Sequence, residues 1–208
     1  MSAIGDELAR AVAELDEPRF LELVDRMLAE PEERKGIFLY IGRGSDEVTR
    51  RYRAGQYFIA DIMMAGALYS EAVARAVRTG GGQPERGRVV LGVVSRDIHE
   101  LGKNVIAGLL EYNGYDVVDL GADVSPAEFT EAVRTLEPDT LILSGVLDLS
   151  LVQMERTISA IEQAGLRDRV RVLLGGSCVT REQSEEIGAD GYIDNLLDCL
   201  RLCGKGGV

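Results

Sequence analysis

The sequence predicts an α/β protein in which an N-terminal helical bundle precedes a doubly wound sheet of five parallel strands. Three observations lead to this prediction. Residues 1–79 show apolar side chains at helical spacing. The stretch RTGGGQPERGR at 78–88 is rich in glycine and charge and shows no apolar period, as linkers do. From residue 89 to 208, short apolar runs alternate with helical stretches, which is typical of βα units. We therefore expect a bundle over 1–79, a linker over 80–88 and an α/β domain over 89–208.

Four or five helices are expected in the bundle. Pro18 and Pro31 open the second and third, because proline is favoured in the first turn of a helix. GRGS at 42–45 is expected to end the third helix, and a separate polar helix should follow. The expected helices begin at about residues 6, 18, 31, 46 and 56, and the last runs to 78. Short connections between such helices indicate a small bundle.

Five short runs rich in valine, leucine and isoleucine predict the strands, at 89–94, 116–120, 140–144, 170–174 and 191–193. Helical stretches follow them at 103–113, 125–136, 149–165, 180–188 and 195–202. Strands that are apolar throughout suit a parallel sheet covered on both faces. Five such units predict a flavodoxin-like domain, whose ligands bind at the carboxyl ends of the strands near the point where the strand order reverses.

Composition excludes several classes of partner. The chain has 208 residues, with 23 basic against 35 acidic ones and a net charge of −12, so we expect no nucleic-acid partner. The N-terminus lacks the layout of a signal peptide, and no apolar run approaches the roughly 20 residues of a membrane helix. The three cysteines, Cys178, Cys199 and Cys203, are too few for a disulfide framework. They are expected to be buried or to have no chemical role. A cytoplasmic protein without a membrane partner is the expectation.

The stretch VSRDIHELGKNV at 94–105 contains the only histidine, His99, on the loop after the first expected strand. A lone loop histidine is often just a surface residue. Here Asp97 could accept an N–H from one ring nitrogen and leave the other free to bind a metal. Gly102 removes a side chain, so that a bulky group could approach the backbone. One histidine cannot supply the four ligands of a bare zinc ion, so the pattern favours a metal already held by a macrocycle.

The motif D-x-H-x-x-G, present as Asp97 to Gly102, resembles the signature of cobalamin-binding domains. The likeness continues through GKNV, GYDVVDLGADVSP, LILSG, LLGGSCVT and IGADGYIDN and covers about 88–203. The bundle, with GQYFIADIMMAGALYSEAV, is similar to the helical cap of the same proteins. The whole chain resembles the corrinoid proteins of methyltransferase systems and the matching modules of cobalamin-dependent methionine synthase.

This resemblance implies roles for individual residues. His99 should coordinate cobalt from below, with the benzimidazole base displaced (base-off, His-on). Asp97 should hold the other ring nitrogen and Ser150 should extend the relay. The nucleotide tail should lie near Ser144, Val146, Gly175 and Gly176, with Gly102 where the loop meets the helix. The family's S-x-L reads Ser144-Gly145-Val146 here, and Asp148 stands where a hydroxyl is usual, which puts the fine contacts of the tail in doubt.

The bundle should cover the upper face of the corrin with residues within 57–69, such as Tyr57, Met63, Met64 or Leu68. The implied function is a methyl carrier, with methylcobalamin and cob(I)alamin as forms of the cofactor. Its implied partners are a substrate-specific methyltransferase, an acceptor methyltransferase using, for example, tetrahydrofolate or a thiol, and a reductive activator. Alternatives are a cobalamin-binding sensor or regulatory module, an adenosylcobalamin-dependent isomerase subunit and a flavodoxin-like module for another ligand. The sequence does not identify the methyl donor.

Overall fold

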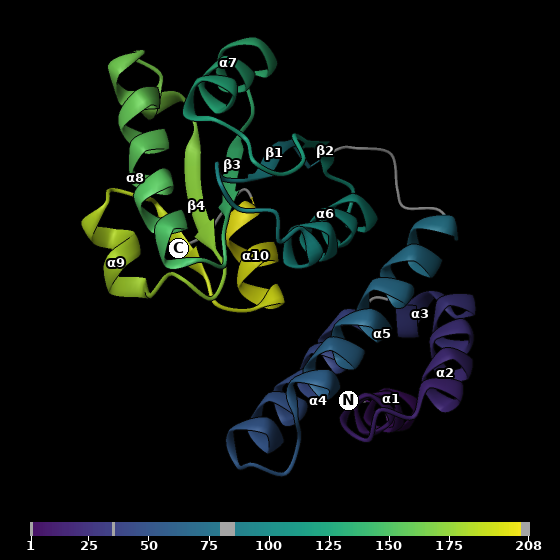
Figure 1. Cartoon of the computed structure of the whole chain (residues 1–208). Coiled ribbons are helices and arrows are strands. Elements are labelled where there is room, and N and C mark those ends of the chain that lie inside the picture. Colours follow the sequence, from purple (N-terminus) through teal and green to yellow (C-terminus); the bar gives the residue numbers. More distant parts are fainter. Residues whose placement is uncertain (1, 35, 80–85, 205–208) are drawn as a thin grey trace. The chain divides into compact units, whose positions relative to one another are not determined.

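The computed structural model describes residues 2–34, 36–79 and 86–204 (Figure 1). The chain divides into two compact units, Met1–Gly81 and Gly82–Val208, and each is described by itself. Most of the linker expected over 80–88 lies outside the described residues. Within its described part, Arg88 already belongs to the first strand.

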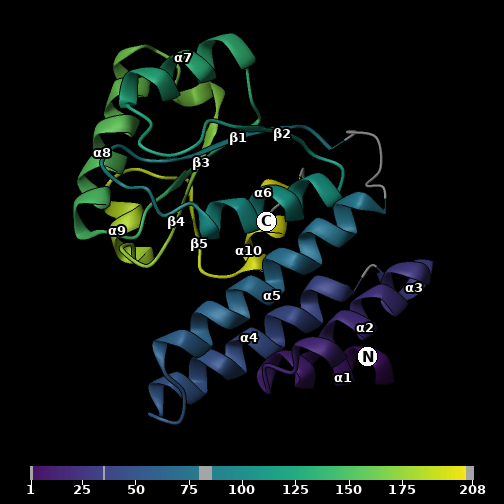
Figure 2. The ribbon, with the colours of Figure 1, turned by 45° about the vertical axis from the view of Figure 1, so that its right-hand side comes forward.

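The helical unit contains α1 (Ala3–Ala13), α2 (Glu17–Ala29), the short α3 (Pro31–Arg34), α4 (Ile37–Arg53) and α5 (Ile59–Arg78) (Figure 2). Side chains cap the first two helices: Ser2 accepts a hydrogen bond from the Gly5 N–H and Asp16 accepts one from the Arg19 N–H. The apolar stripe expected on the second helix is buried, at Phe20, Leu23, Val24, Met27 and Leu28. The helical periodicity of the sequence therefore predicted the buried face of α2, whereas Phe58, expected on the buried face of the last helix, is 74% exposed.

The expectation that GRGS at 42–45 ends a helix is wrong, because α4 runs through it. Gly44 explains the difference. A Cβ atom there would lie 2.5 Å from the Ala9 carbonyl oxygen and 2.5 Å from the Val12 Cβ, both on α1. Glycine at this position allows two helix backbones to approach closely, so it serves packing and not helix termination. The separate polar helix expected after 45 is the second half of α4.

The α/β unit contains one sheet of five parallel strands in the order β2-β1-β3-β4-β5. The strands are β1 (Arg88–Val93), β2 (Asp116–Asp119), β3 (Thr140–Ser144), β4 (Arg171–Gly175) and β5 (Gly191–Ile193). The helices are α6 (Leu101–Tyr112), α7 (Pro126–Leu136), α8 (Asp148–Gln163), α9 (Arg181–Glu186) and α10 (Leu196–Cys203), with the 3-10 turn η1 at Arg167–Arg169. This order is the flavodoxin-like one and confirms the predicted fold class.

Each face of the sheet carries its own apolar core. Val90, Leu141 and Leu174 point to the face covered by α7, α8 and α9, whereas Leu91 and Ile142 point to the face covered by α6 and α10. This double coverage explains why the central parts of β1, β3 and β4 are apolar at consecutive positions. Cys199 and Cys203 belong to the second core, Cys178 is partly buried, and all three are free thiols. No described helix has the length and apolarity that crossing a membrane requires.

Candidate functional site

The candidate site lies at the carboxyl ends of β1 and β3, the neighbouring strands at which the strand order reverses. The loop after β1 carries Asp97 and His99, and α6 begins two residues after the histidine. The loop after β3 carries Gly145 and Val146 and leads into α8. Because the strands are parallel, both loops lie at the same edge of the sheet, and residues almost 50 positions apart in the chain come into contact.

A buried carboxylate connects the two loops. Asp97 Oδ2 accepts hydrogen bonds from the backbone N–H groups of Val146 (2.7 Å) and Leu147 (3.2 Å) and from the Ser150 hydroxyl (2.7 Å). Asp97 Oδ1 accepts one from the His99 backbone N–H (3.0 Å) and lies 2.6 Å from His99 Nδ1. Asp97 itself is inaccessible to solvent. The sequence predicted the contacts with His99 Nδ1 and Ser150, whereas the three backbone donors could not be read from residue types.

These contacts determine where the protons reside. Burial raises the pKa of Asp97, but hydrogen bonds from Val146, Ser150 and His99 outweigh burial and hold this pKa well below its usual range. A carboxylate can only accept hydrogen bonds, so the proton between the two side chains belongs to Nδ1 of His99. In the neutral imidazole with its proton on Nδ1, the other ring nitrogen, Nε2, carries the lone pair that can bind a metal.

The site offers one imidazole as a metal ligand. The His99 side chain is 51% exposed, so its ring is accessible. Among the described residues, no group of three or more histidine, cysteine, aspartate or glutamate side chains could hold a metal ion. A bare ion would thus lack ligands here, whereas a metal whose equatorial positions are filled by a tetrapyrrole needs only an axial donor. The donor set fits such a cofactor.

Gly145 makes the carboxylate network possible, and sequence reasoning did not single it out, because it occupies the variable position of S-x-L. A Cβ atom at this position would lie 2.4 Å from the Ser150 Cβ and 2.9 Å from its hydroxyl oxygen. Any side chain would displace Ser150 from its hydrogen bond with Asp97. A glycine between Ser144 and Val146 is therefore required by the relay itself.

A small pocket extends from His99 between α6 and the sheet and has a volume of about 90 Å³. Its lining includes six of the predicted cofactor-binding residues: His99, Gly102, Ser144, Val146, Gly175 and Gly176. A Cβ atom at Gly102 would meet nothing within 4 Å, so the space beside the helix start is open, as expected for a bulky ligand. This volume is well below the roughly 300–1,000 Å³ of typical small-ligand pockets, so a nucleotide would have to widen it.

The two glycines at the end of β4 have different roles. Gly176 adopts a φ of +121°, and its Cβ would lie 1.8 Å from the Gly145 carbonyl oxygen. The close approach of the two backbones explains this glycine without any ligand. A Cβ at Gly175 would make ordinary contact with Ile193 at 3.7 Å, so packing alone does not require glycine there.

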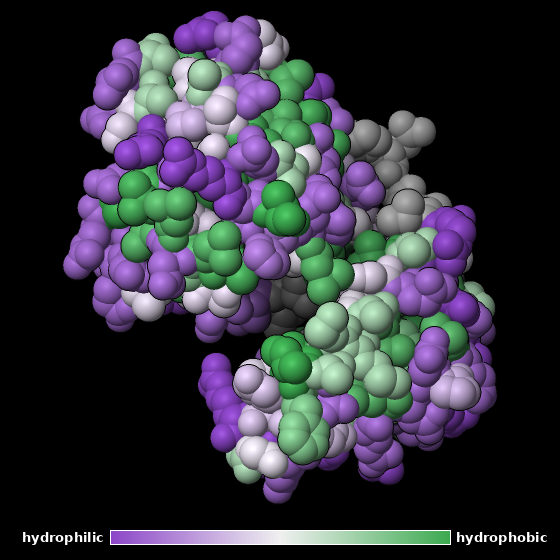
Figure 3. All heavy atoms as spheres, in the orientation of Figure 1, coloured by the Kyte–Doolittle hydropathy of each residue, from purple (hydrophilic) through white to green (hydrophobic). Residues whose placement is uncertain are grey.

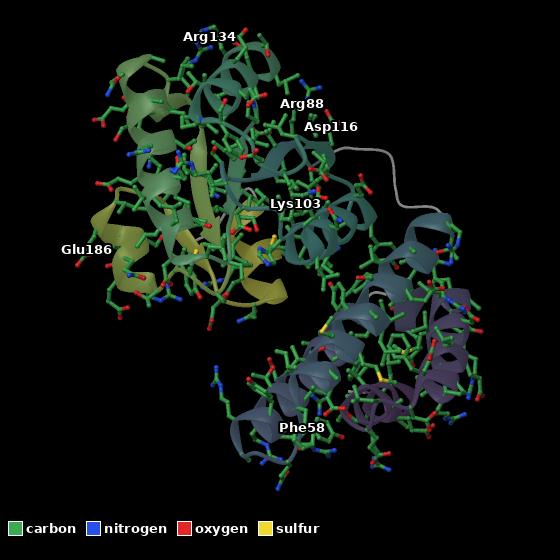
Figure 4. All side chains as sticks on the ribbon, viewed as in Figure 1. Phe58, Arg88, Lys103, Asp116, Arg134 and Glu186 are labelled. Atoms are coloured by element: carbon green, nitrogen blue, oxygen red, sulfur yellow. The ribbon has the colours of Figure 1, made fainter. Side chains whose placement is uncertain are left out.

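Lys103 also lines the pocket, and residue type offers no reason to select it, since lysine is usually exposed. It is only 2% exposed, and Figure 4 labels it on α6. Its ammonium group contacts the Asp119 carboxylate and donates to Asn104 Oδ1 at 2.7 Å. The charge is thus neutralised beside an otherwise apolar pocket.

The remaining predicted residues lie outside this pocket. Asp148 is an exposed residue in the first turn of α8. In the helical unit, the Tyr57 hydroxyl donates to the Ala13 carbonyl oxygen at 2.9 Å, and Leu68 is 4% exposed in the core. Met63 is 65% exposed and Met64 is also accessible. Apolar side chains are visible on the surface of each unit (Figure 3), and Figure 4 labels the exposed Phe58, just before α5.

Comparison with known proteins gives a match for each unit. Residues 87–199 match a family described as the B12 binding domain, and residues 4–76 match a second family with the same description. The dimethylamine corrinoid protein of Methanosarcina barkeri is 29% identical over 197 residues, which cover 93% of this chain and 92% of the relative.

Three solved structures are similar over most of the chain. A cobalamin-binding protein from Desulfitobacterium hafniense is 31% identical with a TM-score of 0.66, and 96% of each chain is covered. The monomethylamine corrinoid protein of Methanosarcina barkeri is 26% identical with a TM-score of 0.74 and the same coverage. The methanol:cobalamin methyltransferase complex of Methanosarcina barkeri is 25% identical with a TM-score of 0.54, over 94% of this chain and 76% of that chain.

Proposed function

Since the chain belongs to the B12-binding corrinoid proteins of methyltransferase systems, we propose that it is a methyl carrier with cobalamin as its cofactor. Cobalamin, when bound, supplies a cobalt that accepts a methyl group from one substrate and donates it to another. The protein supplies ligation, shielding and docking. The observation that carries this proposal is the 2.6 Å contact between His99 Nδ1 and the buried Asp97, which leaves Nε2 available as an axial ligand.

His99 is the proposed lower axial ligand, in a base-off, His-on arrangement. Asp97 fixes the tautomer and the orientation of the ring, because a carboxylate partner on one nitrogen makes the other a better donor. Ser150 and the backbone N–H groups of Val146 and Leu147 hold the carboxylate in turn. These residues thus form a preorganised support for a single metal–nitrogen bond.

The displaced nucleotide tail is proposed to occupy the pocket beside His99. Its approach is supported by the open space at Gly102 and by the absence of a side chain at Gly175, where packing would permit one. Ser144 and Val146 line the same pocket. The pocket volume of about 90 Å³ means that side chains on α6, such as Lys103 and Ile106, have to move aside.

In the helical unit, the proposed cover for the reactive face of the cofactor includes the exposed Met63. Phe58, Ile59 and Met64 are also exposed and follow one another along the start of α5. Exposed apolar side chains of this size need a partner surface to exclude water. Leu68 is buried in its own unit, so its proposed contribution is to support the α5 residues.

The proposed partners are a substrate-specific methyltransferase, an acceptor methyltransferase acting on tetrahydrofolate or a thiol, and a reductive activator. Support comes from the relative named as a dimethylamine corrinoid protein and from the similarity to a chain in the methanol:cobalamin methyltransferase complex. The net charge of −12 favours basic docking surfaces on these partners.

The decisive experiment uses the single histidine. The apoprotein is mixed with hydroxocobalamin, desalted and reduced to cobalt(II), and electron paramagnetic resonance then reports the axial nitrogen. Growth on ¹⁵N-histidine labels only His99. The hyperfine splitting from the axial nitrogen should therefore change from three lines with ¹⁴N to two lines with ¹⁵N. An unchanged splitting, or an unchanged axial nitrogen signal in His99→Ala, would refute the assignment.

Methyl-carrier activity is tested separately. The loaded protein, methylated with iodomethane in its reduced form, should lose the methyl group to a thiol only when an acceptor methyltransferase is present. A cobalamin-responsive sensor would bind the cofactor in the same way but would not support this transfer.

A further inference from the structure

A second loop holds the His99 loop in place. Asp123, between β2 and α7, accepts hydrogen bonds on Oδ1 from the Arg96 backbone N–H (2.6 Å) and the Ser95 hydroxyl (3.3 Å). Its own backbone N–H donates to the Asp97 carbonyl oxygen at 3.1 Å. These three contacts, which we call the Asp123 clasp, tie the two loops together.

The clasp joins two residues in unfavourable backbone conformations. Arg96 has a φ of +67° and Asp123 a φ of +55°, both in the left-handed region that favours glycine. Non-glycine residues stay in this region only where surrounding contacts hold them, and such strain is frequent beside functional sites. The parallel bridge between Val94 and Val124 brings the two segments together immediately beside the clasp.

The clasp completes the support of the axial ligand. The Asp97 side chain is held from the β3–α8 side by Val146, Leu147 and Ser150. Its backbone carbonyl is held from the opposite side, by Asp123. His99 lies only two residues further along, so a shift of the Asp97 backbone would move the imidazole with it.

We propose that Asp123 is a positioning residue for the axial histidine. By holding Arg96 in its left-handed conformation, it sets the height and direction of the ring and so the fraction of cobalt that carries a histidine ligand. The proposal rests on the proposed function, because it presupposes that His99 binds the cobalt of cobalamin.

The test variant is Asp123→Gly, because glycine accepts the positive φ and the substitution removes only the carboxylate. The variant is loaded with cobalamin and reduced to cobalt(II), and the histidine-ligated fraction is measured by electron paramagnetic resonance. We expect bound cobalamin to be retained and the ratio of ligated to unligated cobalt to fall on the order of fivefold. This is less than the about 10- to 100-fold that losing a direct partner of a metal ligand costs. Asp123→Asn keeps an acceptor oxygen and should restore most of the signal.

Asp139 offers a matched control at the opposite end of β1. Its Oδ2 accepts from the Arg88 backbone N–H at 2.9 Å, and its own N–H donates to the Arg88 carbonyl oxygen at 3.0 Å. Asp139→Ala therefore removes the same kind of contact far from the histidine. Asp123→Gly and Asp139→Ala should both lower the melting temperature, but only the first should lower the histidine-ligated fraction.

The outcomes separate the two proposals. If the wild-type protein shows no histidine nitrogen on cobalt, the proposed function fails, whatever Asp123 does. If the wild type shows it and Asp123→Gly keeps the full fraction, the positioning role is overturned alone. Should Asp123→Gly not fold, Asp123→Ser takes its place, because the shorter serine side chain does not reach the position of the carboxylate oxygen that accepts from the Arg96 N–H. An unchanged fraction in that variant likewise overturns the positioning role.

Discussion

Substitution of Gly102 by alanine should change protein stability and cofactor affinity in opposite directions. Gly102 is the second residue of α6, and a Cβ atom there would meet no protein atom within 4 Å. The apoprotein therefore has no steric reason to keep a glycine. If cobalamin lies against the start of α6, however, the added methyl group points into space that the cofactor needs.

The magnitudes follow from these two environments. Alanine is more favourable than glycine inside a helix by roughly 0.5–1 kcal/mol, so the free energy of unfolding of the apoprotein should rise by up to about that amount. Overpacking by one methyl group typically costs about 1–3 kcal/mol. The dissociation constant for cobalamin should therefore rise about 5- to 150-fold.

Urea unfolding of the apoprotein measures the first quantity, and titration with hydroxocobalamin followed by visible absorbance measures the second. Gly42→Ala is the matched control, since Gly42 lies within α4 and its Cβ would also meet nothing within 4 Å. This control should gain similar stability without any change in affinity. If Gly102→Ala gains stability and binds cobalamin as tightly as the wild type, the cofactor does not use this space.

Three further predictions concern the residues that hold the site and the fold. Gly145→Ala should lower the free energy of unfolding by about 2–4 kcal/mol, because a Cβ 2.4 Å from that of Ser150 overpacks the loop and breaks a hydrogen bond to a carboxylate; urea unfolding measures this, and a change below about 0.5 kcal/mol would contradict it. Gly44→Ala should destabilise the helical unit by roughly 1–3 kcal/mol through contact with Ala9 and Val12 of α1, and a rise in melting temperature would show that α1 and α4 can separate freely. The depressed pKa of Asp97 adds stability that is complete above its unfolded value of about 3.9 and is lost as the pH falls toward its folded value. The stability difference between wild type and Asp97→Asn should thus shrink as the pH falls below about 4, whereas an unchanged difference over that range would indicate that the carboxylate is not preferentially stabilised in the fold.

The sequence predicted the parallel sheet well because the signals were local. The runs at 89–94, 140–144 and 170–174 were largely apolar, and the motif after the first strand pointed to the edge where ligands bind in such folds. His99, Asp97 and Ser150 come together as expected, because the parallel topology dictates that the loops after β1 and β3 share an edge.

The features that the sequence could not reveal depend on contacts between distant segments. Gly44 looks like a helix terminator, yet its role is defined by α1, some 35 residues earlier. Gly176 looks like part of a ligand slot, yet the backbone of Gly145 requires it. Lys103 can be buried because Asp119 neutralises its charge and Asn104 accepts a hydrogen bond from it. Asp123 is important because it contacts the backbone of Arg96 in its left-handed conformation. Residue type carries no trace of such partners.

The anchoring of Asp97 has a mechanical consequence. One contact joins its carboxylate to the imidazole, whereas four other hydrogen bonds hold the same group from the backbone and from Ser150. If the ring tilts or withdraws, the carboxylate keeps those four bonds and stays in position. If His99 binds cobalt as proposed, its ring can tilt about the contact with Asp97 while the carboxylate and the loops that hold it stay in place.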